Sequence, residues 1–214
     1  MELYVFAGTV YVTWLPTAQE PQLFRVGDPS LATTPFQLSD ANQFFELSKD
    51  PDIRNEYPNM RFENIEEAKA YLEAQIDLTE NSGLSFFKAI RIVYDGLEPV
   101  YTEENNILVG FISLHKIGAL DQIFAGGFQQ TLGYAIKSAY RGKGLMTIAL
   151  NMTLDAMRRD GYNVMAAAVK KQNISSIRVL EKCGFIMVRD YQISLLYVKR
   201  ITMDKDEFDK VFGL

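Results

Sequence analysis

The sequence has little of the chemistry that binds metals or forms disulfides: its 214 residues include one cysteine, Cys183, and one histidine, His115. A single cysteine excludes an internal disulfide framework and a cluster of thiolate ligands, and a single histidine excludes a histidine-rich metal site. We therefore expect a chain without a bound metal in a reducing compartment, which we take to be the cytoplasm.

Positive charge is also scarce, because 22 lysine and arginine residues stand against 27 acidic residues and leave a net charge of −5. This balance argues against nucleic acid or an anionic membrane as a partner and slightly favours cationic partners such as amines. The apolar residues 1–14 contain Glu2 and no basic region, and they are too short to span a bilayer. We expect neither a signal peptide nor a membrane anchor.

The composition is that of a globular protein, with 48% hydrophobic and 23% charged residues. We find no internal repeat, low-complexity segment or linker, and we expect one domain over residues 1–214. Within it we distinguish an N-terminal strand extension (1–35), a core (36–202) and a C-terminal tail (203–214). The sequence leaves open whether the protein is a monomer or a homodimer.

Hydrophobic periodicity and turn residues predict an α/β (α+β) fold. Strands are expected over 3–6, 9–15, 22–26, 86–94, 107–114, 132–137, 163–169, 185–191 and 195–201. A first helix begins at Ser39 or Asp40 and is broken at Asp50-Pro51-Asp52. Further helices are expected over 65–79, 145–159, 173–184 and 204–212.

The most informative stretch is the turn Arg141-Gly142-Lys143-Gly144, which joins a predicted strand to the strongest predicted helix. Glycine lets the backbone approach a ligand closely. The first N–H groups of a helix have no internal partner and carry partial positive charge. This arrangement predicts a phosphate site.

Two sequence blocks carry a family resemblance. Arg141-Gly142-Lys143-Gly144-Leu145-Met146 resembles the Gln/Arg-x-x-Gly-x-Gly/Ala signature of the GNAT superfamily of acetyl-CoA-dependent N-acetyltransferases, with Met146 in place of a small residue. The block from Asn173 to Phe185 is similar to the Asn-x-x-Ser…Glu-Lys-x-Gly-Phe block of the RimJ/RimL-like branch. The resemblance implies a mixed, mostly antiparallel twisted sheet flanked by helices, here with extra N-terminal strands.

The resemblance also implies where acetyl-CoA, the co-substrate, would bind. Backbone N–H groups from Arg141 to Met146 would cradle its pyrophosphate, with Thr147 in the first helical turn. The strand before the turn would splay from its neighbour and pair its backbone with the pantetheine. The residues assigned to this pairing are Tyr134, Ala135, Ile136 and Lys137.

Asn173 and Ser176 lie where the resemblance brings the second block to the thioester. Asn173 would contact the pantetheine or acetyl region, or cap a helix, or do both. Ser176 would donate to the sulfur or line the thioester, or remain a surface hydroxyl. Many family members place a tyrosine general acid at the position of Leu180, so the leaving thiolate needs another donor here or none. Cys183 lies on an apolar helix face and is expected in the core.

The acceptor amine must be neutral to attack the thioester, and His115 at the end of the central strand is a candidate base or water relay. Glu46, Glu56 and Glu63 are weaker candidates near the first two helices, and Tyr134 could face the acetyl group or pack in the core. The branch resemblance favours a protein or peptide N-terminal α-amine as the acceptor. A small amine, and a non-catalytic CoA-binding module of the same fold, remain alternatives.

Overall fold

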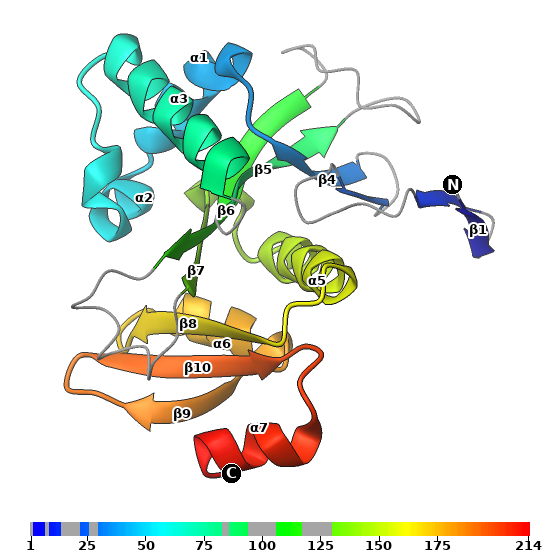
Figure 1. The fold of residues 1–214 in the computed structure, drawn as a ribbon. Coiled ribbons are helices and arrows are strands. Elements are labelled where there is room, and N and C mark those ends of the chain that lie inside the picture. Colours follow the sequence, from blue (N-terminus) through cyan, green and yellow to red (C-terminus); the bar gives the residue numbers. More distant parts are fainter. Residues whose placement is uncertain are drawn as a thin grey trace.

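The computed structural model describes residues 2–6, 9–13, 22–25, 30–82, 86–93, 106–116 and 130–214. Its strands form two larger sheets and an N-terminal hairpin of β1 (Glu2–Phe6) and β2 (Thr9–Thr13) (Figure 1). The predicted loop between the central strand and the strand before the turn lies outside these residues, except for Lys116 at its start.

The first sheet has five antiparallel strands in the order β3-β4-β5-β6-β7. They are β3 (Gln22–Arg25), β4 (Ser30–Pro35), β5 (Phe86–Val93), β6 (Asn106–Lys116) and β7 (Gln130–Ile136). Helices cover both faces, so the middle strand β5 is buried along its whole length. Even its Arg91 is buried, and an ion pair with Asp40 together with a hydrogen bond from Nε to Thr34 Oγ1 (2.8 Å) compensates that charge.

One face of this sheet carries α1 (Ala41–Ser48), α2 (Pro51–Glu56) and α3 (Ile65–Ser82). Their apolar sides enclose a core that includes Phe44, Leu72 and Phe111. The opposite face packs against α5 (Leu145–Arg159), and α5 and α6 (Ile174–Lys182) both contribute to a larger core that the two sheets share (Figure 1).

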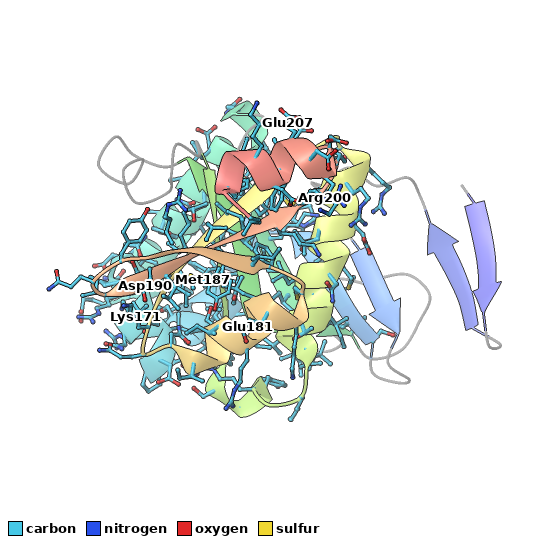
Figure 2. The ribbon with its side chains drawn as sticks, turned by 90° about the horizontal axis from the view of Figure 1, so that it is seen from below. Lys171, Glu181, Met187, Asp190, Arg200 and Glu207 are labelled. Carbon is cyan, nitrogen blue, oxygen red and sulfur yellow. The ribbon has the colours of Figure 1, made fainter. Side chains whose placement is uncertain are left out.

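The second sheet consists of β8 (Val164–Lys170), β10 (Ser194–Arg200) and β9 (Ile186–Asp190), in that order and antiparallel. The C-terminal helix α7 (Lys205–Phe212) packs Phe208 against Ala166, Leu196 and Val198 of this sheet. Figure 2 views the sheet from below, where the ion pair of Lys171 with Asp190 joins the ends of β8 and β9.

The two sheets part between β7 and β8, which lie near each other without pairing. We call this place the β7–β8 junction. Among the strands that the structure describes, none pairs with the edge of β7 at this junction, in agreement with the predicted splay. Backbone N–H and C=O groups along such an edge need partners from elsewhere.

On its other edge, β7 pairs with β6, and the two backbones lie very close together at Gly110. The pairing of β5 with β6 shifts register after Ile90, so Val109 has no partner on β5. Val109 O accepts instead from Lys137 N, which follows β7 (2.8 Å). A Cβ on the neighbouring Gly110 would lie only 2.3 Å from Ala135 O, so this position has no room for a side chain.

The mixed α/β fold with antiparallel sheets and flanking helices is confirmed. The predicted break of the first helix at Asp50-Pro51-Asp52 is confirmed, because α1 ends at Ser48. The helix α2, which Asp50 caps and Pro51 opens, was not predicted. The third helix continues to Ser82, past its predicted end. Residues 30–35, for which no separate strand was predicted, form β4 beside β5.

Candidate active site

The glycine turn opens α5 in the way that the sequence predicts. Gly142 and Gly144 have φ values of 75° and 77°, and a Cβ on either would meet nothing within 4 Å. Gly144 is the N-cap and supplies no side chain to bond the first N–H groups of α5. Phosphate oxygens fit these exposed donors, and the positive end of the helix dipole favours their charge.

Met146 does not disturb this cradle, although it replaces a small residue of the family signature. Its side chain is 7% exposed and packs in the main core, so it turns away from the exposed face of the turn. Lys143 is exposed and lies over the ring of Tyr140, with Nζ 5.4 Å from the ring centroid. It adds positive charge beside the cradle.

The side chain of Arg141 binds protein groups. Its Nε donates to Ile136 O (3.1 Å), and its guanidinium forms an ion pair with Asp52 of α2. Asp50 reinforces this link, because Oδ2 accepts from Ser138 N at 2.7 Å while Oδ1 caps α2. We call the contacts of Asp50 and Asp52 with Ser138 and Arg141 the α2 clamp; they tie α2 to the glycine turn.

Asp50 is held ionised by the α2 clamp. Partial burial pushes the pKa of its carboxyl up, but hydrogen bonds from Ser138 and from the first N–H groups of α2 outweigh that effect and leave the pKa below its ordinary value. Those bonds favour the carboxylate because an ionised oxygen is the stronger acceptor.

A tyrosine that sequence reasoning missed holds the unpaired edge of β7. The Tyr57 hydroxyl accepts from Tyr134 N (2.9 Å) and donates to Tyr134 O (3.0 Å). Its ring packs edge-on against Phe111, and burial raises the pKa of the Tyr57 phenol, which stays protonated. A pantetheine that paired with Tyr134 would have to displace this hydroxyl.

The side chain of Tyr134 reaches α6. Its hydroxyl lies 2.8 Å from Ser176 Oγ and donates to Ser176 O at 3.2 Å. Burial raises the pKa of the Tyr134 phenol. Asn173 is the N-cap of α6, and its Oδ1 accepts from Ser176 N at 3.1 Å, so the capping role foreseen for Asn173 is present. The structure thus brings Tyr134, Asn173 and Ser176 together at the β7–β8 junction.

The remaining candidates are more dispersed. His115 lies one residue before the end of β6, with its backbone opposite Thr131, and its side chain is outside the described part of the chain. Glu46 pairs with Lys49, and Glu63 is exposed at the start of α3. Glu56 pairs with Lys170 of β8 at 3.1 Å, which extends α2 across the β7–β8 junction.

Leu180 and Cys183 both face the core. Leu180 is 1% exposed, so the position at which the family resemblance leads one to expect a tyrosine general acid is apolar and buried here. Cys183 is confirmed as a core residue, and burial raises the pKa of its thiol to about 11, which keeps it protonated and unreactive.

Across the described residues, no three His, Cys, Asp or Glu side chains gather in a way that would hold a metal ion. None of the helices in that part of the chain combines the length and apolar character needed to cross a bilayer.

A family model described as the acetyltransferase (GNAT) domain matches residues 31–186. The chain belongs to this family. The match contains the glycine turn, α2 and the segment from Asn173 to Phe185, which are the parts that meet at the β7–β8 junction.

Three GNAT relatives show similarity over part of their length. The chain is 36% identical over 89 residues to a probable N-acetyltransferase, YjcK, of Bacillus subtilis, covering 40% of this chain and 45% of that protein. It is 31% identical over 104 residues to an L-methionine sulfoximine/L-methionine sulfone acetyltransferase of Salmonella typhimurium (48% and 57%). It is 28% identical over 94 residues to the L-amino acid N-acyltransferase MnaT of Escherichia coli (43% and 52%). The chain thus spans about half the length of each relative.

Solved GNAT structures share the fold at low sequence identity. A ribosomal-protein-S5-alanine acetyltransferase from Vibrio fischeri superposes with a TM-score of 0.60 at 21% identity, covering 85% of this chain and 97% of that one. The acetyltransferase MccE, solved with acetyl-CoA and AMP, gives 0.60 at 17% identity (82% and 94%). RimL, an α-N-protein acetyltransferase solved with coenzyme A, gives 0.62 at 16% identity (86% and 100%). These structures include RimL- and RimJ-type ribosomal protein acetyltransferases.

Proposed function

We propose that this protein transfers the acetyl group of acetyl-CoA to a primary amine, and that its favoured acceptor is the N-terminal α-amine of a protein or peptide. The observation that carries the donor half is the open glycine turn at the start of α5, where both glycines have positive φ, a Cβ on either would meet nothing within 4 Å, and the N-cap Gly144 makes no side-chain hydrogen bond to the helix. Acetyl-CoA supplies an activated acyl group, and its pyrophosphate suits this cradle.

The charges on α1 and α2 support an α-amine as the acceptor. Among the described carboxylates of these helices and the Asp50 cap, Glu46 pairs with Lys49, Asp52 with Arg141 and Glu56 with Lys170, while Asp50 accepts from Ser138. These carboxylates are therefore engaged with other groups. An amine that is already partly neutral at pH 7 needs the least help from a general base. An α-amine with a pKa near 7.8 costs roughly 1 kcal/mol to deprotonate at pH 7, against roughly 4–5 kcal/mol for a lysine amine.

The names of two similar proteins also fit an α-amine as the acceptor. MnaT is named for L-amino acids, and RimL for the α-amino group of a protein. We propose His115 as the base or water relay that takes the proton from the amine. If so, His115→Ala should remove the acidic limb of the pH–rate profile, and an unmoved limb would clear His115 of this role.

A thiol-release assay with acetyl-CoA and three kinds of acceptor tests the proposal. We expect CoA release with a peptide that has a free N-terminus, and none with the same peptide blocked at its N-terminus but retaining a lysine. Release with free amino acids or polyamines alone would overturn the peptide acceptor in favour of a small amine. A rise in melting temperature with acetyl-CoA but no release with any amine would favour the CoA-binding module, to which the buried Leu180 also points.

A further inference from the structure

Alternation of the backbone shows which groups of β7 face the β7–β8 junction. In an antiparallel pair, the N–H and C=O of one residue point to the same side, and neighbouring residues point to opposite sides. Lys137, which follows β7, donates its N–H to Val109 O of β6 (2.8 Å). Ala135, two residues earlier, faces β6 as well. Tyr134 and Ile136 therefore turn their backbone groups away from β6, to the edge on which the pantetheine of CoA would pair.

Two side chains of the protein itself bind this edge. The Tyr57 hydroxyl accepts from Tyr134 N (2.9 Å) and donates to Tyr134 O (3.0 Å), so one oxygen meets both backbone groups of that residue. Arg141 Nε donates to Ile136 O (3.1 Å). A ligand amide also offers one acceptor and one donor, as the hydroxyl does. The amides of pantetheine and the Tyr57 hydroxyl are therefore alternative partners for the same edge.

The Tyr57 hydroxyl is held at this edge from several sides. Its ring packs edge-on against Phe111, with centroids 5.0 Å apart, and burial raises the pKa of the phenol, so the hydroxyl keeps its proton. The preceding residue, Glu56, pairs with Lys170 of β8 at 3.1 Å. Because Tyr57 binds β7 and Glu56 binds β8, a ligand that enters between these strands has to move the end of α2.

We propose that Tyr57 is an intramolecular competitor of CoA: its hydroxyl occupies the backbone groups of Tyr134 when CoA is absent and yields them to the pantetheine when CoA binds. The edge of β7 is then satisfied in both states. The apparent affinity for CoA is lowered by the free energy needed to displace the hydroxyl, as for any ligand whose receptor must first leave its preferred state. The inference rests on the proposed CoA site and adds a contact that sets how tightly CoA is held.

Tyr57→Phe tests the competition, because it keeps the ring on Phe111 and removes only the hydroxyl. Calorimetric titration of the full chain with CoA should show roughly five- to tenfold tighter binding by this variant than by wild type, since one net hydrogen bond is worth about that factor. The nucleotide 3′-phospho-ADP keeps the pyrophosphate of CoA but lacks the pantetheine. It should bind both proteins equally, so the two ligands together isolate the contribution of the pantetheine.

Tyr71→Phe is the matched control. Tyr71 of α3 is a partly buried tyrosine that packs on the same core as Tyr57, but its hydroxyl accepts from Asn59 Nδ2 (3.2 Å). Its removal should leave the affinity for CoA unchanged. Glu56→Gln weakens the ion pair that holds the end of α2 to β8 and should also tighten CoA binding, by a smaller factor. It provides the same test if Tyr57→Phe does not fold.

Thermal melts give a second readout of the same exchange. Without ligand, Tyr57→Phe should melt at a lower temperature than wild type, because the buried backbone groups of Tyr134 lose their partner. In saturating CoA this difference should shrink, since the hydroxyl no longer binds Tyr134 in either protein. A tyrosine with a merely structural role would lower the melting temperature equally with and without CoA.

Three results would overturn the competition. One is a Tyr57→Phe protein that binds CoA no more tightly than wild type, because the hydroxyl would then stay in place or assist the ligand. Another is a gain in affinity that is equally large with 3′-phospho-ADP. Both leave the donor site standing. A wild-type protein that binds neither ligand would refute the donor site together with the competition, which distinguishes failure of the proposed function from failure of this inference.

Discussion

At the scale of single residues, the glycine turn depends on the positive φ values of Gly142 and Gly144. These two glycines predict the turn from the sequence, because glycine adopts φ near 75° without strain. Asn173 predicts the start of a helix, because an asparagine side chain accepts hydrogen bonds from the first backbone N–H groups of a helix. Tyr57 gives no such signal, since its hydroxyl gains meaning only when the fold brings it to Tyr134, far along the chain. The sequence Tyr57-Pro58 indicates only that regular structure is interrupted there, and it does not point to a role for the Tyr57 hydroxyl.

Gly144→Asp should weaken CoA binding at least tenfold, because a carboxylate at the cradle repels phosphate and the left-handed conformation strains an L residue by about 1 kcal/mol. Gly161→Asp is the matched control: Gly161 also has a φ of 77° and open space, but it follows the opposite end of α5. Calorimetric titration with CoA measures both. Equal losses of affinity in the two variants would contradict the cradle.

At the scale of elements, α2 joins the two halves of the site. The α2 clamp fixes the N-terminal end of α2 to the glycine turn. Tyr57, the residue that follows α2, binds β7, and Glu56 in the last turn of α2 pairs with Lys170 on β8. Asp50-Pro51 carries the local signals of a helix start, a capping aspartate followed by proline. The prediction from the sequence is only a break that ends the first helix, and these local signals do not show where a new helix leads. Only the tertiary structure shows that this helix spans the β7–β8 junction.

Asp50→Ala should lower stability by about 1 kcal/mol at pH 7 through the lost cap and should also weaken CoA binding through the loosened turn. The stabilising effect of Asp50 is complete above the ordinary aspartate pKa of 3.8 and is lost as the pH falls through its lower folded pKa. Denaturant melts at pH 7 and near pH 3 should therefore show a difference from wild type that shrinks in acid.

Asp204→Ala provides the control for Asp50→Ala, because Asp204 caps α7 with two similar backbone bonds, and α7 packs on the second sheet. It should lose stability while CoA affinity stays unchanged. Undiminished CoA affinity in Asp50→Ala would show that the α2 clamp does not support the turn.

At the scale of the whole molecule, periodicity finds the strands and helices but not the division into two sheets. The apolar patterns of β7 and β8 look alike in sequence, and neither shows that these strands lie near each other without pairing. Side chains of α5, α6 and both sheets instead share one core. The helix α7 adds a small third core on the outer face of the second sheet.

Phe208→Ala should lower the free energy of unfolding by about 3 kcal/mol, because it removes a ring that is 2% exposed from this third core. CoA affinity should not change, since α7 packs away from the glycine turn (Figure 1). Val211→Ala on the same helix is the control, as Val211 is 56% exposed and should cost little. Chemical denaturation of the wild-type, Phe208→Ala and Val211→Ala proteins measures their free energies of unfolding. A Phe208→Ala protein as stable as Val211→Ala would mean that α7 is dispensable.

The close approach of Gly110 to Ala135 O means that the absence of a side chain at position 110 sets the spacing between β6 and β7. A side chain there would press on Ala135 O and push β7 away from β6, towards β8. The displaced strand would carry with it the backbone that Tyr57 binds and the phenol that meets Ser176. Position 110 thus governs the alignment of groups that it never touches, and Gly110→Ala would register as a loss of acetyl-transfer rate without the loss of any functional side chain.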